Sequence, residues 1–310
     1  MSAADRLRQL LDRRIVVLDG AIGTLLPDVV NRDGLVLSDP RRVLRIHEDY
    51  LAAGADIIKT NSFRATSIAQ AAHGLGARAY ELNVTAARLA RNAADGWSRE
   101  TPGRRRFVAG VVGPAGAIPE GGREAYAEQI RGLVDGGVDL LLVETIVDTR
   151  AASAALAAAA AEFARRGTSS PVMLSATVDR TGRLPSGETL EAFVDAVRDA
   201  RPFSVGLNCA YGARGIGAHV AELARHWDGR ISCHPSAGLP DDSGEYGEHP
   251  ADLASVLRRL AEAGLVNIVG GCCGTNPAYT RTMAEAVEDV PAGMIRMPRG
   301  RSRPSPSDPS

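Results

Sequence analysis

The sequence predicts an α/β protein folded as a single-domain (β/α)8 TIM barrel. The first observation behind this prediction is a series of eight short aliphatic runs. They are continuous apolar runs without strict alternation, which is typical of parallel strands buried on both faces. The runs are Ile15–Leu18, Asp56–Lys59, Phe107–Val112, Asp139–Val143, Val172–Ala176, Ser204–Leu207, Arg230–Cys233 and Asn267–Val269.

The second observation is that amphipathic helical stretches separate these runs. Their apolar residues recur at three- and four-residue spacing. Several stretches end at a glycine that leads into the next run, as at Gly54, Gly136 and Gly264. Eight alternating units in about 275 residues favour a barrel. Examples of the predicted helices are Val43–Ala53, Ala77–Ala94, Tyr126–Gly136, Thr149–Arg165, Leu190–Ala200 and Ala251–Ala263.

The third observation concerns the main alternative, a doubly wound open sheet. Such a sheet usually carries a glycine-rich phosphate loop after its first strand. The segment Asp19–Thr24 reads DGAIGT and lacks the G-x-G-x-x-G spacing. A later cluster at Gly212, Gly215 and Gly217 has that spacing reversed, so neither segment supports a dinucleotide site.

Composition excludes several classes of function. The 310 residues carry 36 basic and 37 acidic side chains, a net charge of −1, so no broad basic field attracts nucleic acid or anionic lipid. No apolar run approaches the ~20 residues of a membrane span, and the charged N-terminus is unlike a signal peptide. We expect a cytoplasmic protein with no nucleic-acid or membrane partner. The barrel should occupy residues 1–290, followed by a disordered Pro/Arg/Ser-rich tail over 291–310.

The four cysteines follow the sixth, seventh and eighth predicted strands. In a barrel these strands are neighbours, and function lies at their C-terminal ends. Glycines on both sides of Cys272 and Cys273 allow the two sulfurs to face one point, and Cys209 would add a third thiolate. Three soft thiolates suit Zn²⁺, and an open fourth position marks a catalytic site. We therefore predict Cys209, Cys272 and Cys273 as zinc ligands.

Other interpretations of the cysteines remain open from the residues alone. The adjacent pair Cys272-Cys273 is also compatible with buried apolar packing, a strained disulfide or a redox pair. Cys233 or His234 is an alternative to Cys209 as the third ligand. A buried free thiol is the favoured interpretation of Cys233.

Charged residues at other strand ends complete the predicted rim. Asp19 follows the first strand and Glu144 closes the fourth, so the two carboxylates together suit an ammonium group. Asp19 as a helix cap and Glu144 in a structural salt bridge are the alternatives. Lys59, the only lysine, ends the second strand. It suggests a Schiff-base aldolase as an alternative enzyme, or else a solvated or ion-paired lysine.

Five segments resemble the zinc-dependent homocysteine S-methyltransferase family, over about Ile15 to Ala286. Two further segments, SGETLEAF and AGLPDDSGEY, resemble the homocysteine-binding module of cobalamin-dependent methionine synthase. The family segments are Val17–Thr24 (VLDGAIGT), Ala52–Phe63 (AAGADIIKTNSF), Leu142–Thr149 (LVETIVDT), Gly206–Ala213 (GLNCAYGA) and Asn267–Thr275 (NIVGGCCGT). The two further segments are Ser186–Phe193 and Ala237–Tyr246.

This resemblance implies a barrel with the three predicted zinc ligands and the homocysteine sulfur in the fourth position. It further implies that the two rim carboxylates hold the amino group and that nearby backbone N–H groups receive the carboxylate. We also place the neighbour of Cys209 in the GLNCAYGA segment among the substrate-binding residues. The predicted substrate contacts are Asp19, Gly20, Ala21, Glu144 and Asn208.

The implied reaction is methyl transfer to the homocysteine thiol, as in methionine biosynthesis. The expected donor is a small methyl-sulfonium compound, S-methylmethionine or S-adenosylmethionine. The alternative is one subunit of a split system that takes methyl from a separate methylcobalamin (corrinoid) protein. Two positions depart from the methionine-synthase pattern. Ser236 replaces an asparagine that serves as a resting zinc contact, and Lys59 replaces a glutamate.

Overall fold

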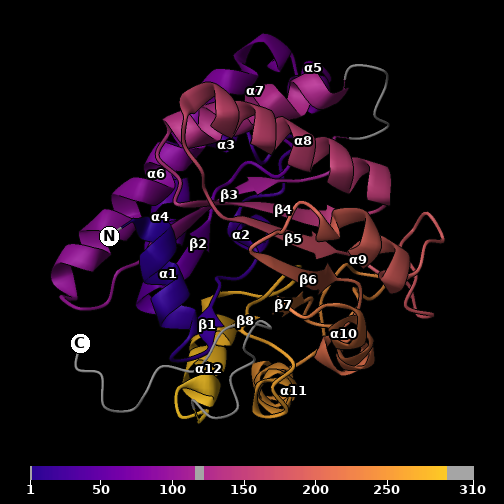
Figure 1. Ribbon diagram of the computed structural model, residues 1–310. Coiled ribbons are helices and arrows are strands. Elements are labelled where there is room, and N and C mark those ends of the chain that lie inside the picture. The colour runs from indigo at the N-terminus through magenta and orange to yellow at the C-terminus, as the bar shows by residue number, and fades with distance from the viewer. Residues whose placement is uncertain (1, 116–121, 292–310) are drawn as a thin grey trace.

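A closed barrel of eight parallel strands forms the centre of the molecule in the computed structural model, which describes residues 2–115 and 122–291 (Figure 1). The strands pair in the order β1-β8-β7-β6-β5-β4-β3-β2, and a bridge between Leu18 and Ile57 joins β1 to β2. The predicted TIM barrel is thereby confirmed. The strands are β1 (Val16–Val17), β2 (Ile57–Lys59), β3 (Phe107–Val112), β4 (Leu140–Ile146), β5 (Val172–Ala176), β6 (Ser204–Cys209), β7 (Arg230–Pro235) and β8 (Ile268–Val269).

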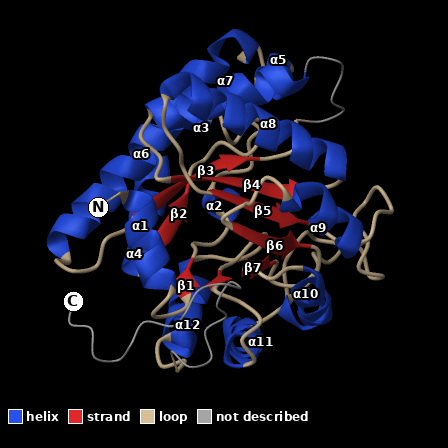
Figure 2. Cartoon of the chain, viewed as in Figure 1, coloured by secondary structure: helices blue, strands red, loops and turns tan. Residues whose placement is uncertain are grey.

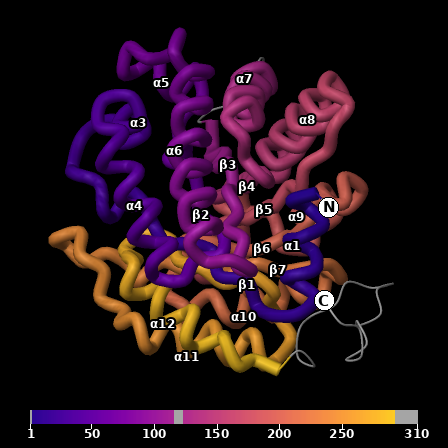
Figure 3. Tube along the Cα trace, turned by 90° about the vertical axis from the view of Figure 1, so that its left-hand side faces the viewer, coloured from indigo at the N-terminus to yellow at the C-terminus, as the bar shows by residue number. Residues whose placement is uncertain are grey.

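Helices surround the strands on all sides (Figure 2). Figure 3 shows how α4, α6, α7 and α8 follow one another around the barrel, and each contacts the next. The helices are α1 (Ala3–Leu11), α2 (Ile22–Leu25), α3 (Leu35–Ser38), α4 (Pro40–Ala52), α5 (Ser67–Ala71), the 3-10 helix η1 (Gly76–Arg78), α6 (Ala79–Glu100), α7 (Gly122–Asp135), α8 (Thr149–Arg166), α9 (Leu190–Arg198), α10 (Ala213–His226), α11 (Pro250–Glu262) and α12 (Pro277–Val287).

Three strands run further toward the C-terminal rim than their apolar patterns predict. The predicted fourth strand ends at Val143, but β4 continues through Glu144 to Ile146. Similarly, β6 and β7 stay paired through Asn208↔His234 and one step beyond. Polar side chains interrupt the apolar pattern, but the backbone ladder does not depend on side-chain polarity. These polar residues therefore belong to the barrel wall itself, where their position is fixed by strand pairing.

Two long helices were not among those predicted, α10 and α12. The glycines of α10, Gly215 and Gly217, lower its intrinsic helix propensity. The helix nevertheless buries Ile216, Val220 and Leu223 on one face. Burial of this apolar face outweighs the cost of the glycines, because tertiary packing supplies most of the stability of a protein helix.

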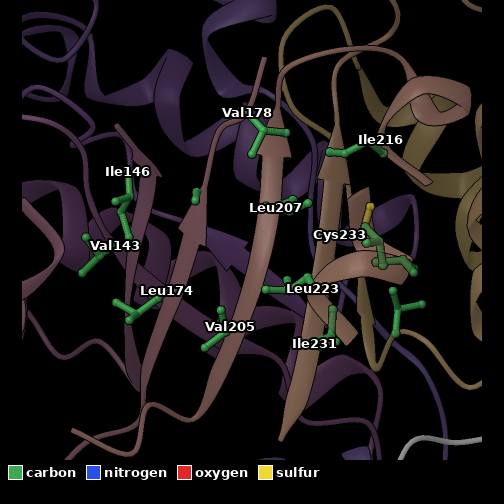
Figure 4. Packing of buried hydrophobic residues seen from close by; sticks show 14 of the residues in the cluster. Val143, Ile146, Leu174, Val178, Val205, Leu207, Ile216, Leu223, Ile231 and Cys233 are labelled. Carbon is green, nitrogen blue, oxygen red and sulfur yellow. The ribbon is translucent and has the colours of Figure 1, made fainter. Parts of the chain in front are cut away.

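The apolar core has an inner and an outer layer. Inside the barrel, side chains such as Leu18, Leu142 and Met173 pack together, and Leu7 and Leu11 of α1 join the same cluster. The helix α1 therefore closes the end of the barrel opposite the C-terminal rim. Figure 4 shows the outer layer, where strands meet the surrounding helices. Its labelled members are Val143, Ile146, Leu174, Val178, Val205, Leu207, Ile216, Leu223, Ile231 and Cys233.

The tail predicted over 291–310 lies, from residue 292 on, outside the described residues, so its disorder stays a prediction. Over the part of the chain that the structure describes, no helix is both long enough and apolar enough to cross a membrane.

Candidate functional site

Three cysteine sulfurs meet at the C-terminal rim of the barrel. Cys209 Sγ lies 3.1 Å from Cys272 Sγ and 3.5 Å from Cys273 Sγ, and the last two sulfurs are 4.0 Å apart. Three ligands of a tetrahedral zinc ion, each at 2.3 Å, stand about 3.7 Å from one another. The sulfurs thus have the spacing of a zinc site. All four cysteines are free thiols, so a disulfide between Cys272 and Cys273 is excluded here.

Backbone hydrogen bonds hold the turn that carries Cys272 and Cys273. The N–H of Gly271 donates to the carbonyl of Asp19 at 3.1 Å, and the N–H of Cys272 donates to the carbonyl of Pro235 at 2.8 Å. The carbonyl of Cys273 accepts from the N–H of Ala237, in the loop after β7, at 2.9 Å. The turn is therefore tied to β1 on one side and to β7 on the other, which places its sulfurs beside β6.

The glycines around the pair are needed for this turn. A Cβ atom on Gly271 would overlap the hydroxyl oxygen of Thr275 and lie 2.8 Å from its Cβ. Gly274 has a φ of +79°, and a side chain there would overlap the ring of Tyr246. A larger residue at either position would displace the turn, because its added atoms would overlap the Thr275 side chain or the Tyr246 ring.

On the opposite side of the cluster, Cys209 has an unusual backbone. Its φ is +59°, that of Ala210 is +58°, and that of Thr145 on β4, two strands away, is +57°. Residues with side chains rarely adopt this left-handed region, and such strain is concentrated at functional sites. The strain directs the Cys209 sulfur away from the sheet ladder and toward the two other sulfurs.

Two side chains orient the sulfurs from outside the cluster. Asn208 donates from Nδ2 to Thr145 Oγ1 at 2.9 Å and to Cys272 Sγ at 3.8 Å, and its Oδ1 accepts from Thr145 N at 3.0 Å. Its amide is thus committed to β4 and to a sulfur, and the predicted substrate contact stays a prediction. The ring of Tyr246 packs against Gly274, and its hydroxyl interacts electrostatically with the neighbouring Cys273. Sequence reasoning did not assign Tyr246 to the site, although it ends the AGLPDDSGEY segment.

Hydrogen bonds among the three thiols make Cys273 the most acidic of them. Hydrogen bonds from Cys209 and Cys272 lower the pKa of Cys273, whereas the same contacts raise the pKa of Cys209. Cys233 has no part in this cluster. It is fully buried in the outer core, and burial raises its pKa to about 12. The interpretation of Cys233 as a buried free thiol is confirmed.

A second group of polar side chains lies inside the barrel mouth. Asp19 and Lys59 are an ion pair, with Oδ1 and Nζ 3.8 Å apart, and Asp19 Oδ2 accepts the backbone N–H of Lys59 at 2.8 Å. Glu144 Oε2 stands 4.0 Å from His234 Nδ1. Several of these buried atoms have no hydrogen-bond partner within the described residues: Asp19 Oδ1, Glu144 Oε2, His234 Nδ1 and His234 Nε2.

Burial governs the charge state of this group. It raises the pKa of both Asp19 and Glu144 to about 7, against the opposing effect of Lys59. It lowers the pKa of His234 to about 3, so that imidazole is neutral at pH 7. The charges of Glu144 and Asp19 overcome the burial of Lys59 and raise its pKa. A protonated amine cannot attack a carbonyl, so the aldolase interpretation of Lys59 loses its chemical basis.

The predicted carboxylate contact lies at the start of α2. The N–H of Ala21 already donates to Thr275 Oγ1 at 3.2 Å, and the hydroxyl of Tyr50 donates to the Ala21 carbonyl at 2.9 Å. Gly20 packs tightly against Tyr50 and Thr275. The roles of Gly20 and Ala21 in carboxylate binding stay predictions. Ser236, predicted to alter the resting zinc contact, is buried just after β7.

The only group of three His, Cys, Asp or Glu residues with metal-binding spacing within residues 2–115 and 122–291 is Cys209, Cys272 and Cys273. Their thiolates are soft donors of the kind that zinc prefers, and the partly exposed cluster leaves a fourth direction open. The residues present therefore fit a catalytic zinc ion.

Comparison with known proteins agrees with this geometry. A sequence model of the family described as Homocysteine S-methyltransferase matches residues 16–287. The metallated form of the homocysteine methyltransferase MmuM from Escherichia coli is 26% identical, with a TM-score of 0.75, and the match covers 90% of this chain and 99% of that one. Its apo form matches at 26% identity with a TM-score of 0.73, over 90% and 99% of the two chains. The chain therefore belongs to the homocysteine S-methyltransferase family of enzymes.

Proposed function

We propose that this protein transfers a methyl group to the thiol of homocysteine, giving methionine, with Cys209, Cys272 and Cys273 holding a zinc ion. The observation that carries the proposal is the convergence of three sulfurs within hydrogen-bonding distance of one another, beside unpartnered buried carboxylates. Membership of the family supports homocysteine as the acceptor. A thiol end and an amino-acid end of one substrate would match these two parts of the site.

When bound, zinc supplies a means of keeping the acceptor thiol in its thiolate form at neutral pH, where a free thiol of pKa about 8.5 is mostly protonated. The protein's own residues do the remaining work. Asn208 hydrogen-bonds to the sulfur of Cys272, and Tyr246 packs beside Cys273 against Gly274, so that both side chains help to hold the sulfurs in place. The carboxylates of Asp19 and Glu144 receive the substrate ammonium group, which orients the thiol toward the donor.

The expected donor is a small methyl-sulfonium compound, S-methylmethionine or S-adenosylmethionine. In the transfer, the acceptor sulfur forms a bond to the methyl carbon as the donor's carbon–sulfur bond breaks. The electron pair of that bond stays on the departing sulfur, which becomes a neutral thioether. The acceptor thiol has already lost its proton, so charge and atoms balance.

A second candidate places this chain in a split system, where it accepts methyl from a separate methylcobalamin protein. The observation that favours it is the contact of Tyr246 with Cys273. Tyr246 belongs to the AGLPDDSGEY segment, which resembles the homocysteine module of cobalamin-dependent methionine synthase. A segment characteristic of that branch therefore forms part of the site wall.

A methionine-formation assay tests both candidates. The purified protein receives homocysteine with S-methylmethionine, S-adenosylmethionine or methylcobalamin, each with and without added zinc. Methionine formation with either sulfonium donor supports the first candidate. Methionine formation with methylcobalamin, but with neither sulfonium donor, supports the second. If the zinc-loaded protein forms no methionine from any of the three donors, the proposal is wrong. Cys272→Ala is the control and is expected to abolish turnover.

A further inference from the structure

Resting on the proposed function, we propose that the ammonium group of Lys59 binds the α-carboxylate of the amino-acid acceptor and so selects acceptors that carry one. Lys59 ends β2, and its side chain is buried in the barrel mouth, with the residue only 5% exposed. Its charge lies close to Glu144, Asp19, Cys272 and Cys273, whose negative charges all act on it. The Lys59 ammonium therefore lies near both the carboxylates of Asp19 and Glu144 and the cysteine sulfurs.

The hydrogen bonds of Lys59 are incomplete. A lysine ammonium has three N–H donors. One of them donates to the carbonyl of Gly271 at 3.1 Å. The nearest carboxylate oxygen, Asp19 Oδ1, is 3.8 Å from Nζ, beyond the ordinary hydrogen-bond range. Within the described residues, the carbonyl of Gly271 is the only acceptor at ordinary hydrogen-bond distance from this buried ammonium, and the strongest further acceptor for it is an anion.

Carboxylate oxygens near Lys59 lack hydrogen-bond donors. Asp19 Oδ1 and Glu144 Oε2 are buried without a hydrogen-bond donor. Among the described residues, the ion pairs of Lys59 and Glu144 are with other partners: Lys59 Nζ pairs with Asp19, and Glu144 lies beside His234. A buried cation beside anions whose oxygens lack hydrogen-bond donors has the charge pattern that suits a zwitterion. An α-amino acid would place its ammonium at the two carboxylates and its carboxylate at Lys59, so that opposite charges alternate.

The alternative receptor for the carboxylate is weaker. The N–H of Ala21 is engaged by Thr275 Oγ1 at 3.2 Å, and a substrate carboxylate would have to displace that hydroxyl. A neutral N–H also forms a weaker hydrogen bond to a carboxylate than an ammonium does. Lys59 thus supplies what the start of α2 lacks in this chain, a charged donor that makes one hydrogen bond, to the carbonyl of Gly271.

The test compares two acceptor thiols in three proteins. Homocysteine carries the carboxylate, and 3-aminopropane-1-thiol is the same molecule without it. The proteins are the wild type, Lys59→Met, which keeps length without charge, and Lys59→Arg, which keeps charge. We expect Lys59→Met to raise KM for homocysteine by about 10- to 100-fold with little change in kcat. Its KM for 3-aminopropane-1-thiol should stay at the wild-type value, and Lys59→Arg should recover part of the loss.

Two further measurements separate this role from a structural one. Zinc content of Lys59→Met should remain one per chain, since the three sulfurs are intact. Calorimetry on zinc-free protein should show that Lys59→Met weakens binding of L-methionine but not of 3-(methylthio)propylamine, its decarboxylated analogue. Equal losses with both members of a pair would overturn the role of Lys59. The proposed function fails separately, through absent methionine formation by the wild type.

Discussion

Replacing Cys209 by alanine removes one of the three sulfurs that meet at the barrel rim. The two that remain, Cys272 and Cys273, are 4.0 Å apart and can still bind one ion. Zinc in a four-ligand protein site is bound with about 10 to 16 kcal/mol, or about 2.5 to 4 kcal/mol for each ligand if the ligands share it equally. Loss of one thiolate should therefore weaken zinc binding by roughly two to three powers of ten.

The structure offers a matched control in Cys233→Ala. Cys233 lies on β7, which pairs with β6, the strand of Cys209. Its side chain packs in the outer apolar core (Figure 4) and is not part of the three-sulfur cluster. Both variants remove one sulfur, so nonspecific effects of cysteine loss are shared between them. The Cys233 variant should keep wild-type zinc affinity and lose only a modest amount of stability.

Competition with a chromophoric chelator measures the zinc dissociation constant of each protein under reducing conditions. Zinc affinity of Cys209→Ala equal to that of the wild type would refute the assignment of Cys209. An equally large loss of zinc affinity in Cys233→Ala would show that the three-sulfur geometry does not determine binding.

Three other predictions follow from the geometry. Since burial raises the pKa of Glu144 to about 7, its carboxylate loses charge below that pH, and kcat/KM for homocysteine should fall on the acid side; an unchanged acid limb in Glu144→Gln contradicts this. Gly271→Ala should lower the free energy of unfolding, measured with urea, by about 1 to 3 kcal/mol and should weaken zinc binding. Gly96→Ala, at a position with open space around it, should leave the free energy of unfolding unchanged or raise it. Equal effects of the two substitutions would argue against steric overlap at Gly271 as the cause. Leu7→Ala should lower the unfolding free energy by about 2 to 5 kcal/mol and Leu10→Ala by less, because only Leu7 is fully buried in the barrel end; the reverse order would exclude α1 as its closure.

Much of the fold could be predicted from local pattern. Buried parallel strands need continuous apolar runs, and each of the eight runs overlaps one of the strands observed. Strand ends were less well predicted, because Glu144, Asn208 and His234 are polar yet stay in the ladder. The helix α10 was missed because its glycines mask a periodic apolar face that only the barrel surface makes useful.

The cysteine cluster could be anticipated because barrel topology makes strand ends six and eight converge on one rim. Tyr246 could not, since it lies on a loop whose path no periodicity encodes, and its resemblance to a known segment was the only available signal. The neutral state of His234 was equally hidden, because it depends on burial by distant parts of the chain.

The sequence by itself determined the alternation of strands and helices and the thiol set that suits zinc, because both follow from residue type and spacing. Only the tertiary structure decided the surroundings of Lys59. Its backbone N–H donates to Asp19, 40 positions away, and its ammonium forms an ion pair with the same residue and donates to the carbonyl of Gly271, 212 positions away. Those contacts arise when the barrel closes β1 against β2 and brings β8 alongside, and the charge and free donors of a buried lysine depend on such neighbours rather than on its place in the chain.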